Sequence, residues 1–369
     1  MQVFNCDQCG HLVFFDSVEC LHCGATLAFL PQSLEIAAME PLENDRWRRT
    51  GQKGAQTSAV QRFCRNRTEY KACNFTVDDS DPHALCVSCR QTRWLPDLSD
   101  LANLRRWRQI EAAKRLLYYN LARLGLRPRP GERAPVYHLL EDLEGQPRVM
   151  TGHDNGTITL NVAEADDEER ARRRISLNEP YRTLIGHLRH ECGHFFWDLL
   201  IKDTPNLERF RILFGDERED YGEALQRYYA KEDKLTGWQD SFISSYAQSH
   251  PWEDWAETWA HYLHMVDLLE TAASYHTRVT VPDPAQPHDQ RVENPFGANR
   301  PDFATMLEQW VPLTLLLNSL NRSLGHLDAY PFALSAGARC KLLWVHELLQ
   351  QHRYDSELQY VDEAASPEM

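Results

Sequence analysis

Residues 190–194 read His-Glu-Cys-Gly-His, a spacing of two imidazoles and one carboxylate that could hold and use a metal ion. On a helix, positions i and i+4 lie one turn apart on the same face, so His190 and His194 could share one Zn²⁺. Glu191 is offset around the helix, where its carboxylate could act on a water instead of binding the metal. The alternative is an amphipathic helix that carries these residues by chance.

The flanking sequence favours the metal site. Apolar residues recur at helical spacing on both sides of the motif, and Pro180 stands where a first helical turn tolerates proline. Histidines buried in such a helix would be costly without a partner. A third histidine further along the same helix is excluded, because Trp197 and Leu200 occupy the positions that the longer zinc motif requires. The third ligand must therefore come from another segment.

The best source is the segment 251–264, which predicts a helix with two stripes. The tryptophans of one stripe are expected to pack in the core. The second stripe has spacings of four, four and three residues, and spacing alone does not choose the ligand among its members. Glu253 follows Pro251 closely, where the helix dipole favours a carboxylate without any metal. The second stripe consists of Glu253, Glu257, His261 and His264.

At this point the chain resembles the gluzincins, and more closely a bacterial family of zinc-binding metallopeptidases with a zinc ribbon ahead of a zincin domain. The resemblance rests on the amino-terminal CxxC and on "TGHDNGTITLNVAEADD", "EPYRTLIGHLRHECGHFFWD", "FGDERED" and "HPWEDWAETWAHYLHMVDLLE". It implies Glu257 as the third zinc ligand, with Glu253 or Asp254 orienting a ligand histidine. It also implies that Thr157–Asn161 is a cleft-lining edge strand that pairs with extended substrate, although an ordinary sheet strand fits the sequence equally well.

The chemistry we expect is zinc-dependent hydrolysis of a peptide or amide bond. Glu191 would be the general base, and Tyr246, just ahead of the second helix, is a candidate second oxyanion donor whose alternative role is packing. The competing function is a non-catalytic zinc scaffold for protein contacts, in which the zincin domain is degenerate. We favour the enzyme, because a degenerate site would be expected to have lost its ligands or its base.

Two sets of cysteines have the spacing of structural zinc ligands. The first is a pair of CxxC knuckles, each followed by a glycine at which a tight turn can form. They predict a zinc ribbon, which could also contact a protein partner. The second set is less regular and has His83 as a possible substitute ligand. Cys192 and Cys340 are expected to be buried apolar residues. The two sets are Cys6, Cys9, Cys20 and Cys23, and Cys64, Cys73, Cys86 and Cys89.

Composition and charge limit the partners. The formal net charge is −14 and residues 1–40 contain no Lys or Arg, which disfavours nucleic-acid binding. The basic run 172–174 follows the acidic run 166–169 and predicts a helix crossed by ion pairs. No stretch is long and apolar enough for a membrane span, and the sequence begins without an export signal. Cysteines in ligand spacing agree with a cytoplasmic protein that acts on a peptide or protein substrate.

The fold class we predict is α+β: a mostly helical zincin-like domain with a small sheet, preceded by the ribbon and a second small zinc module. The predicted order is a ribbon at 1–33, a linker at 34–59, the second module at 60–98, the metallopeptidase domain at 99–353 and an acidic tail at 354–369. One catalytic and one or two structural zinc ions are expected. Within the main domain, Asp100 is expected to cap a helix that runs from Leu101 to about Leu124.

Overall fold

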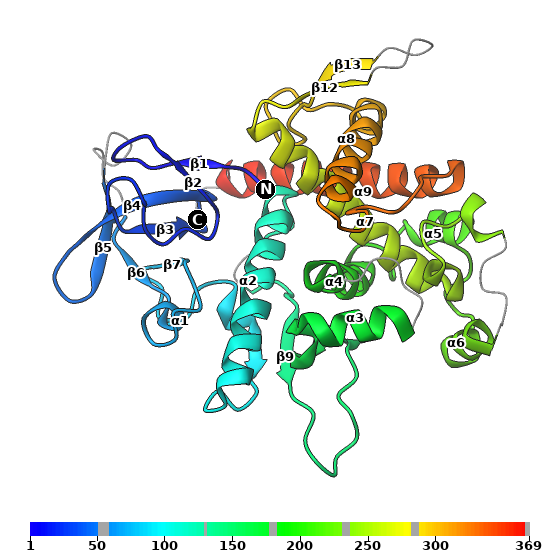
Figure 1. Ribbon diagram of the computed structural model, residues 1–369, viewed down its shortest axis with the longest axis horizontal. Helices are drawn as coiled ribbons and strands as arrows, with labels where there is room; N and C mark the ends of the chain where they lie inside the picture. Colours follow the sequence, from blue (N-terminus) through cyan, green and yellow to red (C-terminus); the bar gives the residue numbers. More distant parts are fainter. Residues whose placement is uncertain (51–58, 129–130, 177–182, 231–236, 282–287, 366–369) are drawn as a thin grey trace.

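The computed structural model describes residues 1–50, 59–128, 131–176, 183–230, 237–281 and 288–365. The amino-terminal strands, with the eight cysteines of the two sets in the segments between them, lie on one side, and helix α2 (Leu101–Arg123) separates them from a mostly helical part (Figure 1). Asp100 caps α2 by accepting a hydrogen bond from the amide of Ala102, and Gly125 takes a positive φ of 84° just after its end, as the sequence predicts. The predicted α+β class is confirmed.

The amino-terminal part is a short hairpin followed by a curled antiparallel sheet. The hairpin joins β1 (Phe4–Asn5) and β2 (Leu12–Val13). The sheet has the order β3-β4-β5-β6-β7, and a bridge between Phe29 and Phe75 brings its first strand beside its last. Its strands are β3 (Leu27–Leu30), β4 (Glu35–Pro41), β5 (Arg46–Arg49), β6 (Gln61–Phe63) and β7 (Thr76–Asp78), and the short helix α1 spans Arg65–Thr68.

This sheet differs from the linker that the sequence suggested. Strands β4 and β5 lie inside residues 34–59, and only 51–58 fall outside the described residues. The sequence analysis missed both strands because residues 34–59 are largely polar. Strand β4 buries only a few small apolar residues, and β5 carries arginines that pair with acidic side chains, among them Arg49 with Asp7 at 2.8 Å. The ribbon and the second zinc module are therefore joined by one continuous sheet.

A second sheet lies beneath the helices and has the order β10-β11-β9-β8. Asn155 and Gly156, both at positive φ, turn β10 into β11, as the sequence predicts for a hairpin. However, β11 pairs on both sides, with β10 and with β9, so β10 and not Thr157–Asn161 is the edge next to the helices. The strands are β8 (Thr92–Trp94), β9 (Val136–Leu140), β10 (Gly152–Asp154) and β11 (Thr157–Asn161).

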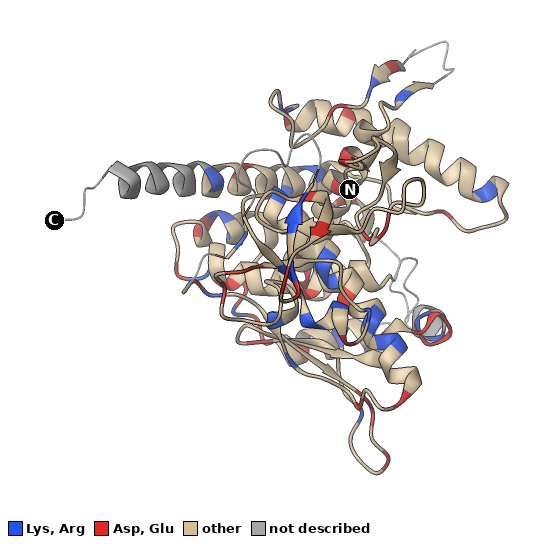
Figure 2. Cartoon of the chain, turned by 90° about the vertical axis from the view of Figure 1, so that its left-hand side faces the viewer, with Lys and Arg blue, Asp and Glu red and all other residues tan. Residues whose placement is uncertain are grey.

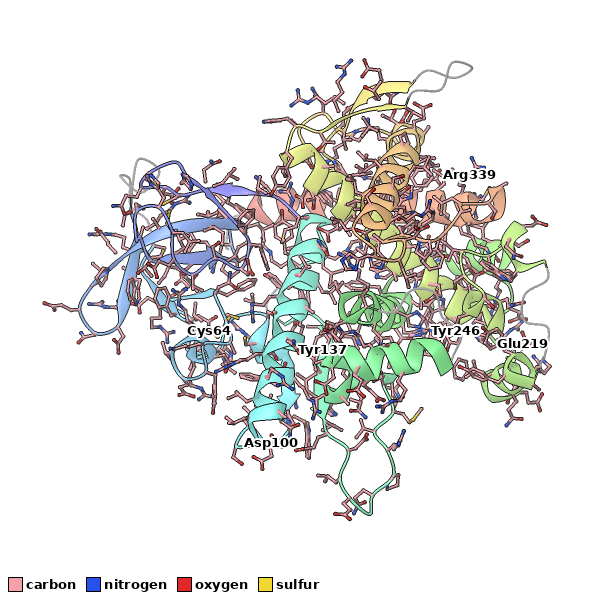
Figure 3. The ribbon with its side chains drawn as sticks, viewed as in Figure 1. Cys64, Asp100, Tyr137, Glu219, Tyr246 and Arg339 are labelled. Carbon is pink, nitrogen blue, oxygen red and sulfur yellow. The ribbon has the colours of Figure 1, made fainter. Side chains whose placement is uncertain are left out.

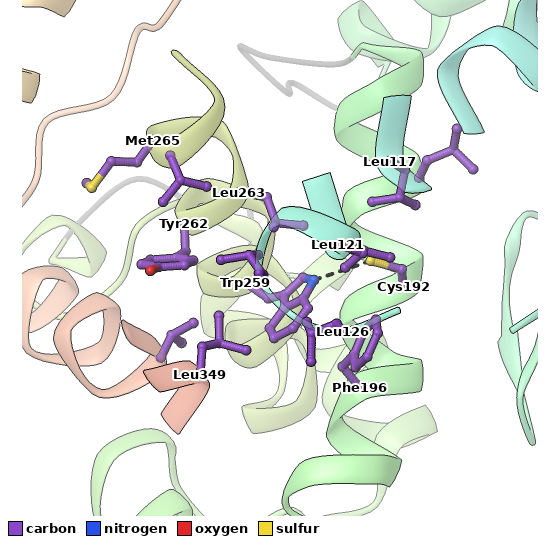
Figure 4. Packing of buried hydrophobic residues seen from close by; sticks show 14 of the residues in the cluster. Leu117, Leu121, Leu126, Cys192, Phe196, Trp259, Tyr262, Leu263, Met265 and Leu349 are labelled. Carbon is purple, nitrogen blue, oxygen red and sulfur yellow. Dashed lines mark hydrogen bonds between the residues drawn. The ribbon is translucent and has the colours of Figure 1, made fainter. Parts of the chain in front are cut away.

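The helical part is built around α4 (Leu184–Leu200) and α7 (Pro251–Ser274). Trp255 and Trp259 are completely buried between them, which confirms their predicted packing role. The indole of Trp255 donates to the carbonyl of Gly193 at 2.8 Å, and that of Trp259 donates to the sulfur of Cys192 (Figure 4). The remaining helices are α3 (Asp167–Ser176), α5 (Leu207–Phe214), α6 (Tyr221–Ala230), α8 (Phe303–Ser323) and α9 (Ala336–Ala365).

Some predicted details need correction. The metal helix begins at Leu184, and Pro180 lies outside the described residues. Cys192 is buried as expected, whereas Cys340 is exposed. Strands β12 (Arg278–Val281) and β13 (His288–Arg291) form a hairpin, although the Pro-, Asn- and Asp-rich composition of residues 281–301 predicts a loop. The acidic tail expected from residue 354 begins inside α9, whose backbone is helical to Ala365.

Charged residues are interspersed along the elements (Figure 2). Arg172, the first residue of the basic run, forms ion pairs within α3, because it contacts Glu168 at 3.0 Å and Glu169 at 2.9 Å. This agrees with the prediction at Arg172, whereas the side chains of residues 173 and 174 lie outside the described part of the structure. In the part of the chain that the structure describes, no helix combines the length and apolar character needed to cross a membrane.

Candidate metal centre

Helix α4 presents the three residues of the motif from a buried position. Its first turn is fixed by Thr183, whose hydroxyl accepts a hydrogen bond from the amide of Gly186 at 3.0 Å. His190, Glu191 and His194 are each less than a tenth exposed, and the two imidazole rings lie 5.0 Å apart between centroids. The predicted pairing of these histidines on one face is therefore observed.

Glu253, near the start of α7, completes a group of three. Its Oε2 lies 3.0 Å from Nε2 of His190 and 3.6 Å from Nε2 of His194. The three ligand atoms all lie within 4.8 Å of one another. Helix α7 places Glu253 here because His250 caps its first turn and Pro251 begins it, so Glu253 leaves the first turn toward α4.

The chemistry of this group fits a zinc ion. Two imidazoles and one carboxylate form a known ligand set for zinc that keeps a further position open. Oε2 of Glu253 is buried and accepts no hydrogen bond from any described residue. Burial alone would raise the pKa of Glu253, but the charges of His194 and His190 hold that pKa well below its usual range. The carboxylate is therefore ionised, and its Oε2 could bind a cation together with the two Nε2 atoms.

Glu257 occupies a different position from the one expected. Its Oε1 lies 2.7 Å from Nδ1 of His190, on the edge of the ring opposite Nε2, and its Oε2 accepts a hydrogen bond from Ser244 at 2.6 Å. Glu257 was expected to be the third ligand, but in this geometry it is Glu253 whose carboxylate groups with Nε2 of both histidines. The reason is the crossing of the helices: α7 meets α4 so that its first turn faces Nε2 and its second faces Nδ1.

Two tyrosines lie beside the group. The hydroxyl of Tyr221 donates to Oε1 of Glu253 at 2.7 Å, an interaction that no spacing in the sequence indicates because α6 and α7 meet only in the fold. The ring of Tyr246 lies 6.0 Å from that of His190, and burial raises the pKa of Tyr246 well above its usual value. Its hydroxyl therefore remains protonated and able to donate. The oxyanion role of Tyr246 stays a prediction.

Three further polar residues around the motif escaped the sequence analysis. His187, one turn before Glu191, has its Nδ1 3.0 Å from Oε2 of Glu164 and its Nε2 3.8 Å from Oε1 of Glu191. His153, on the edge strand β10, stacks 6.2 Å from His194. Burial lowers the pKa of His153 to about 4, so its ring is neutral at pH 7. A helical spacing of four links His187 to Glu191 and was the one available signal.

The remaining members of the α7 stripe have structural partners. His261 is buried and its Nδ1 lies 2.7 Å from the hydroxyl of Tyr330, while Nδ1 of His264 lies 2.6 Å from the guanidinium of Arg189. Asp254 forms a buried ion pair with Lys341 at 2.6 Å. Asp254 therefore does not orient a ligand histidine, which was one of the two possibilities that the resemblance implied.

The first four-cysteine set forms a zinc site in the ribbon. The sulfur of Cys6 lies 3.8 Å from that of Cys23, and the sulfur of Cys9 lies 3.6 Å from that of Cys20. Gly10 and Gly24 follow the knuckles at positive φ, and their amides donate to the carbonyls of Cys6 and Cys20 at 2.8 Å. The predicted turn glycines are thus confirmed.

The second set is a fully buried zinc site. The sulfur of Cys73 lies 3.8 Å from that of Cys86 and 3.7 Å from that of Cys89, and Cys64 completes the group. His83 is exposed and does not belong to it. Cys64 and Tyr246 lie on opposite sides of α2, which places this zinc site and the candidate metal centre in different parts of the molecule (Figure 3).

Comparisons with known proteins agree with these sites. Residues 103–348 match the model of a family described as "Putative zinc-binding metallo-peptidase", and residues 3–100 match that of a zinc-ribbon domain. Uncharacterized proteins of Mycobacterium bovis and Mycobacterium tuberculosis are 37% identical to this chain over 362 residues, which cover 97% of this chain and 98% of theirs. No solved structure gives a significant match.

Proposed function

The chain belongs to the zinc-binding metallopeptidase family that its residues 103–348 match, and from this premise we propose that it hydrolyses peptide or amide bonds with a zinc-bound water. The observation that carries the proposal is the convergence of Nε2 of His190, Nε2 of His194 and Oε2 of Glu253. These three residues would hold the catalytic zinc. Zinc in such a site supplies a water of lowered pKa and polarises the carbonyl that is attacked.

The surrounding residues would orient the ligands and move the proton. Glu257 would fix His190 by accepting a hydrogen bond from its Nδ1–H, which leaves Nε2 free to bind the metal. Tyr221 holds Glu253 through Oε1 and thereby directs Oε2 toward the two rings. Glu191 would take a proton from water on its carboxylate and return it to the leaving nitrogen. Tyr246, protonated and beside His190, would donate to the oxygen that becomes negative during attack.

The substrate we propose is an extended peptide segment or a protein that presents one. Strand β10 (Gly152–Asp154) is the sheet edge nearest α4, and its His153 stacks against His194. An extended chain could add to this edge through backbone hydrogen bonds.

The ten cysteines are all free, and eight lie in the two zinc clusters, which supports a reducing compartment and hence a cytoplasmic protein.

The experiment that tests the proposal replaces the general base. Glu191→Gln should keep its zinc, because Glu191 is not a ligand, yet lower hydrolysis of mixed quenched-fluorescent peptides by about 10²–10⁴-fold. Zinc per chain is measured by plasma mass spectrometry on the same sample. Glu208→Gln, an exposed glutamate on α5, is the matched control and should change neither quantity.

Two outcomes would contradict the proposal. Loss of one zinc in Glu191→Gln would make Glu191 a ligand and remove its role as the base. A wild-type protein that holds all its zinc and cleaves no peptide or protein substrate would favour the second candidate function, a zinc scaffold for protein contacts. The intact group of His190, His194 and Glu253 favours the enzyme.

A further inference from the structure

The carboxylate of Glu164 contacts the imidazole of His187, and the other side of this imidazole lies beside Glu191. Glu164 lies in the short 3-10 turn η2 (Val162–Ala165) that follows β11, and its side chain is only 1% exposed. Its Oε2 lies 3.0 Å from Nδ1 of His187, and its Oε1 accepts a hydrogen bond from Thr151 at 3.2 Å. A buried carboxylate requires such partners, because its removal from water is costly.

Glu164 fixes the orientation of the His187 ring. A carboxylate oxygen accepts hydrogen bonds, so the 3.0 Å contact fits an Nδ1–H of His187 that donates a hydrogen bond to Glu164. With Nδ1 held, the opposite edge of the ring faces the carboxylate of Glu191, where Nε2 lies 3.8 Å from Oε1. Both residues are on α4 and are four positions apart, so the helix itself sets this approach.

We propose that Glu164 and His187 are positioning residues for Glu191: the pair holds the general base in the rotamer that reaches the reacting water. This inference rests on the proposed hydrolysis and deepens it. The ring of His187 occupies the space beside the Glu191 carboxylate, so it limits the rotamers that this carboxylate can adopt. Glu164 follows the strand beside the proposed substrate edge, so the same contact anchors the base to the sheet that would bind substrate.

A positioning role through Glu191 makes a distinctive kinetic prediction. An asparagine side chain at position 187 reaches the place of Nδ1 and can still bond Glu164, whereas a glutamine reaches toward the place of Nε2 and Glu191. We expect His187→Asn to lower kcat by about 10–100-fold with KM and zinc content unchanged, and His187→Gln to recover part of that loss. His326→Asn, at an exposed histidine after α8, is the matched control and should keep full activity.

A double-mutant cycle separates this role from a general loss of structure. In the Glu191→Gln background, His187→Asn should cause no further decrease in kcat, because the residue through which it acts has already been removed. A purely structural role would instead lower the rate by the same factor in both backgrounds. Equal factors, or full activity in His187→Asn, would overturn the proposal.

Two readouts do not depend on activity and decide the proposal even if no substrate is cleaved. In the wild-type protein labelled with ¹⁵N-histidine, NMR should detect an exchange-protected Nδ1 proton of His187 that disappears in Glu164→Gln. In a crystal structure of His187→Asn, the Glu191 carboxylate should leave its wild-type rotamer. Absence of the protected proton, or an unmoved Glu191, would overturn the inference. If both signals are found but the fully zinc-loaded wild type hydrolyses no substrate, the proposed function alone would be contradicted.

Discussion

Two glutamates of α7 contact His190, and the edge of the ring that each one faces decides which of them can bind zinc. Glu253 lies by Nε2, next to His194, whereas Glu257 lies by Nδ1 and also accepts from Ser244. A histidine that binds zinc through one nitrogen commonly donates its other N–H to a carboxylate. The geometry therefore supports our proposal that Glu253 is a ligand and that Glu257, one helical turn away, orients His190.

This separation gives a prediction for two single substitutions. Glu253→Ala should abolish zinc binding at the His190/His194 site, because only two ligands remain there. Glu257→Gln should weaken zinc affinity by about 10–100-fold, since the amide still contacts Nδ1 but does not fix its proton as a carboxylate does. Zinc affinity is measured by competition with a chromogenic chelator. The reverse order of the two effects would restore Glu257 as the ligand.

Sequence spacing could place both glutamates on the face toward α4 but could not choose between them. Positions four residues apart lie on the same face of a helix, and the choice depends on the height and angle at which α7 crosses α4. The His190–Glu191–His194 group was predictable because all its members are on one helix. Tyr221 and Glu164 were not, because each reaches the site from an element far along the chain.

A buried histidine gives the molecule a pH dependence. Burial lowers the pKa of His261 to about 4, from an ordinary value of 6.5, so the fold favours the neutral ring. The stability from this preference is fully present above about pH 6.5 and is lost as the pH falls through about 4. The loss amounts to roughly 3 kcal/mol.

The measurement compares urea unfolding of the wild type and of His261→Asn at pH 7 and at pH 4.5. The asparagine has no ring to protonate, and its amide reaches the place of Nδ1 and can still bond Tyr330, so the free energy of unfolding should fall less between the two pH values in the variant. Equal decreases in both proteins would show that His261 does not contribute.

At the scale of elements, the site depends on how closely α4 and α7 approach at Gly193. A Cβ built there would lie 3.1 Å from the Cα of Ala256 and 3.1 Å from the Cδ1 of Trp259. Gly193 stands between the proposed zinc ligand His194 and the proposed base Glu191, so any separation of the helices also moves Glu253 away from the two imidazoles. The small residues Gly193 and Ala256 thus allow the close approach of α4 and α7 that brings Glu253 to the two histidines.

We expect Gly193→Ala to weaken zinc binding and to lower the melting temperature, although alanine favours helix by about 1 kcal/mol over glycine. Overpacking a tight contact costs about 1–3 kcal/mol, which outweighs the gain in propensity. Gly222→Ala on α6 is the matched control, because a Cβ there meets only a side-chain oxygen of Asp220 at 3.5 Å. It should leave zinc affinity unchanged and should not lower the melting temperature. Equal behaviour of the two variants would contradict the argument.

Elements marked by local signals were predictable, and those defined by pairing were not. Asp100 and Gly125 define the ends of α2 from the sequence alone, as Asn155 and Gly156 define the hairpin of β10 and β11. Which strand forms the edge depends on the order of the sheet, and β11 became internal once β9 paired with it. Strand β5 was missed because its arginines are read as polar until their acidic partners are known.

At the scale of the whole molecule, the two structural zinc sites share one hydrophobic core with α2. This core contains cysteines of both sites together with Phe29, Phe75 and the α2 residue Tyr119. Tyr119 is followed on α2 by Asn120, which accepts a hydrogen bond of 2.6 Å from Arg189, the neighbour of His190. The cysteine spacing predicted two zinc sites, but it could not show that one sheet joins them or that α2 lies between them and the candidate metal centre.

The two structural sites should therefore differ in their effect on the His190/His194 zinc. Cys23 lies at the partly exposed side of the ribbon, so Cys23→Ser should remove the ribbon zinc alone. Cys86 is completely buried in the shared core, so Cys86→Ser should remove the second zinc and also loosen α2 and, through Asn120 and Arg189, the helix that carries His190.

Zinc per chain and the melting temperature are measured for both variants, with His190→Ala as the reference for loss of the His190/His194 zinc. We expect Cys23→Ser to retain zinc in two of the three sites and Cys86→Ser to melt at a lower temperature and bind the His190/His194 zinc more weakly. Loss of the His190/His194 zinc in Cys23→Ser would mean that the ribbon and the helical domain form a single cooperative unit. Unchanged binding of the His190/His194 zinc in Cys86→Ser would mean that α2 does not transmit a change at the second cysteine site to the candidate metal centre.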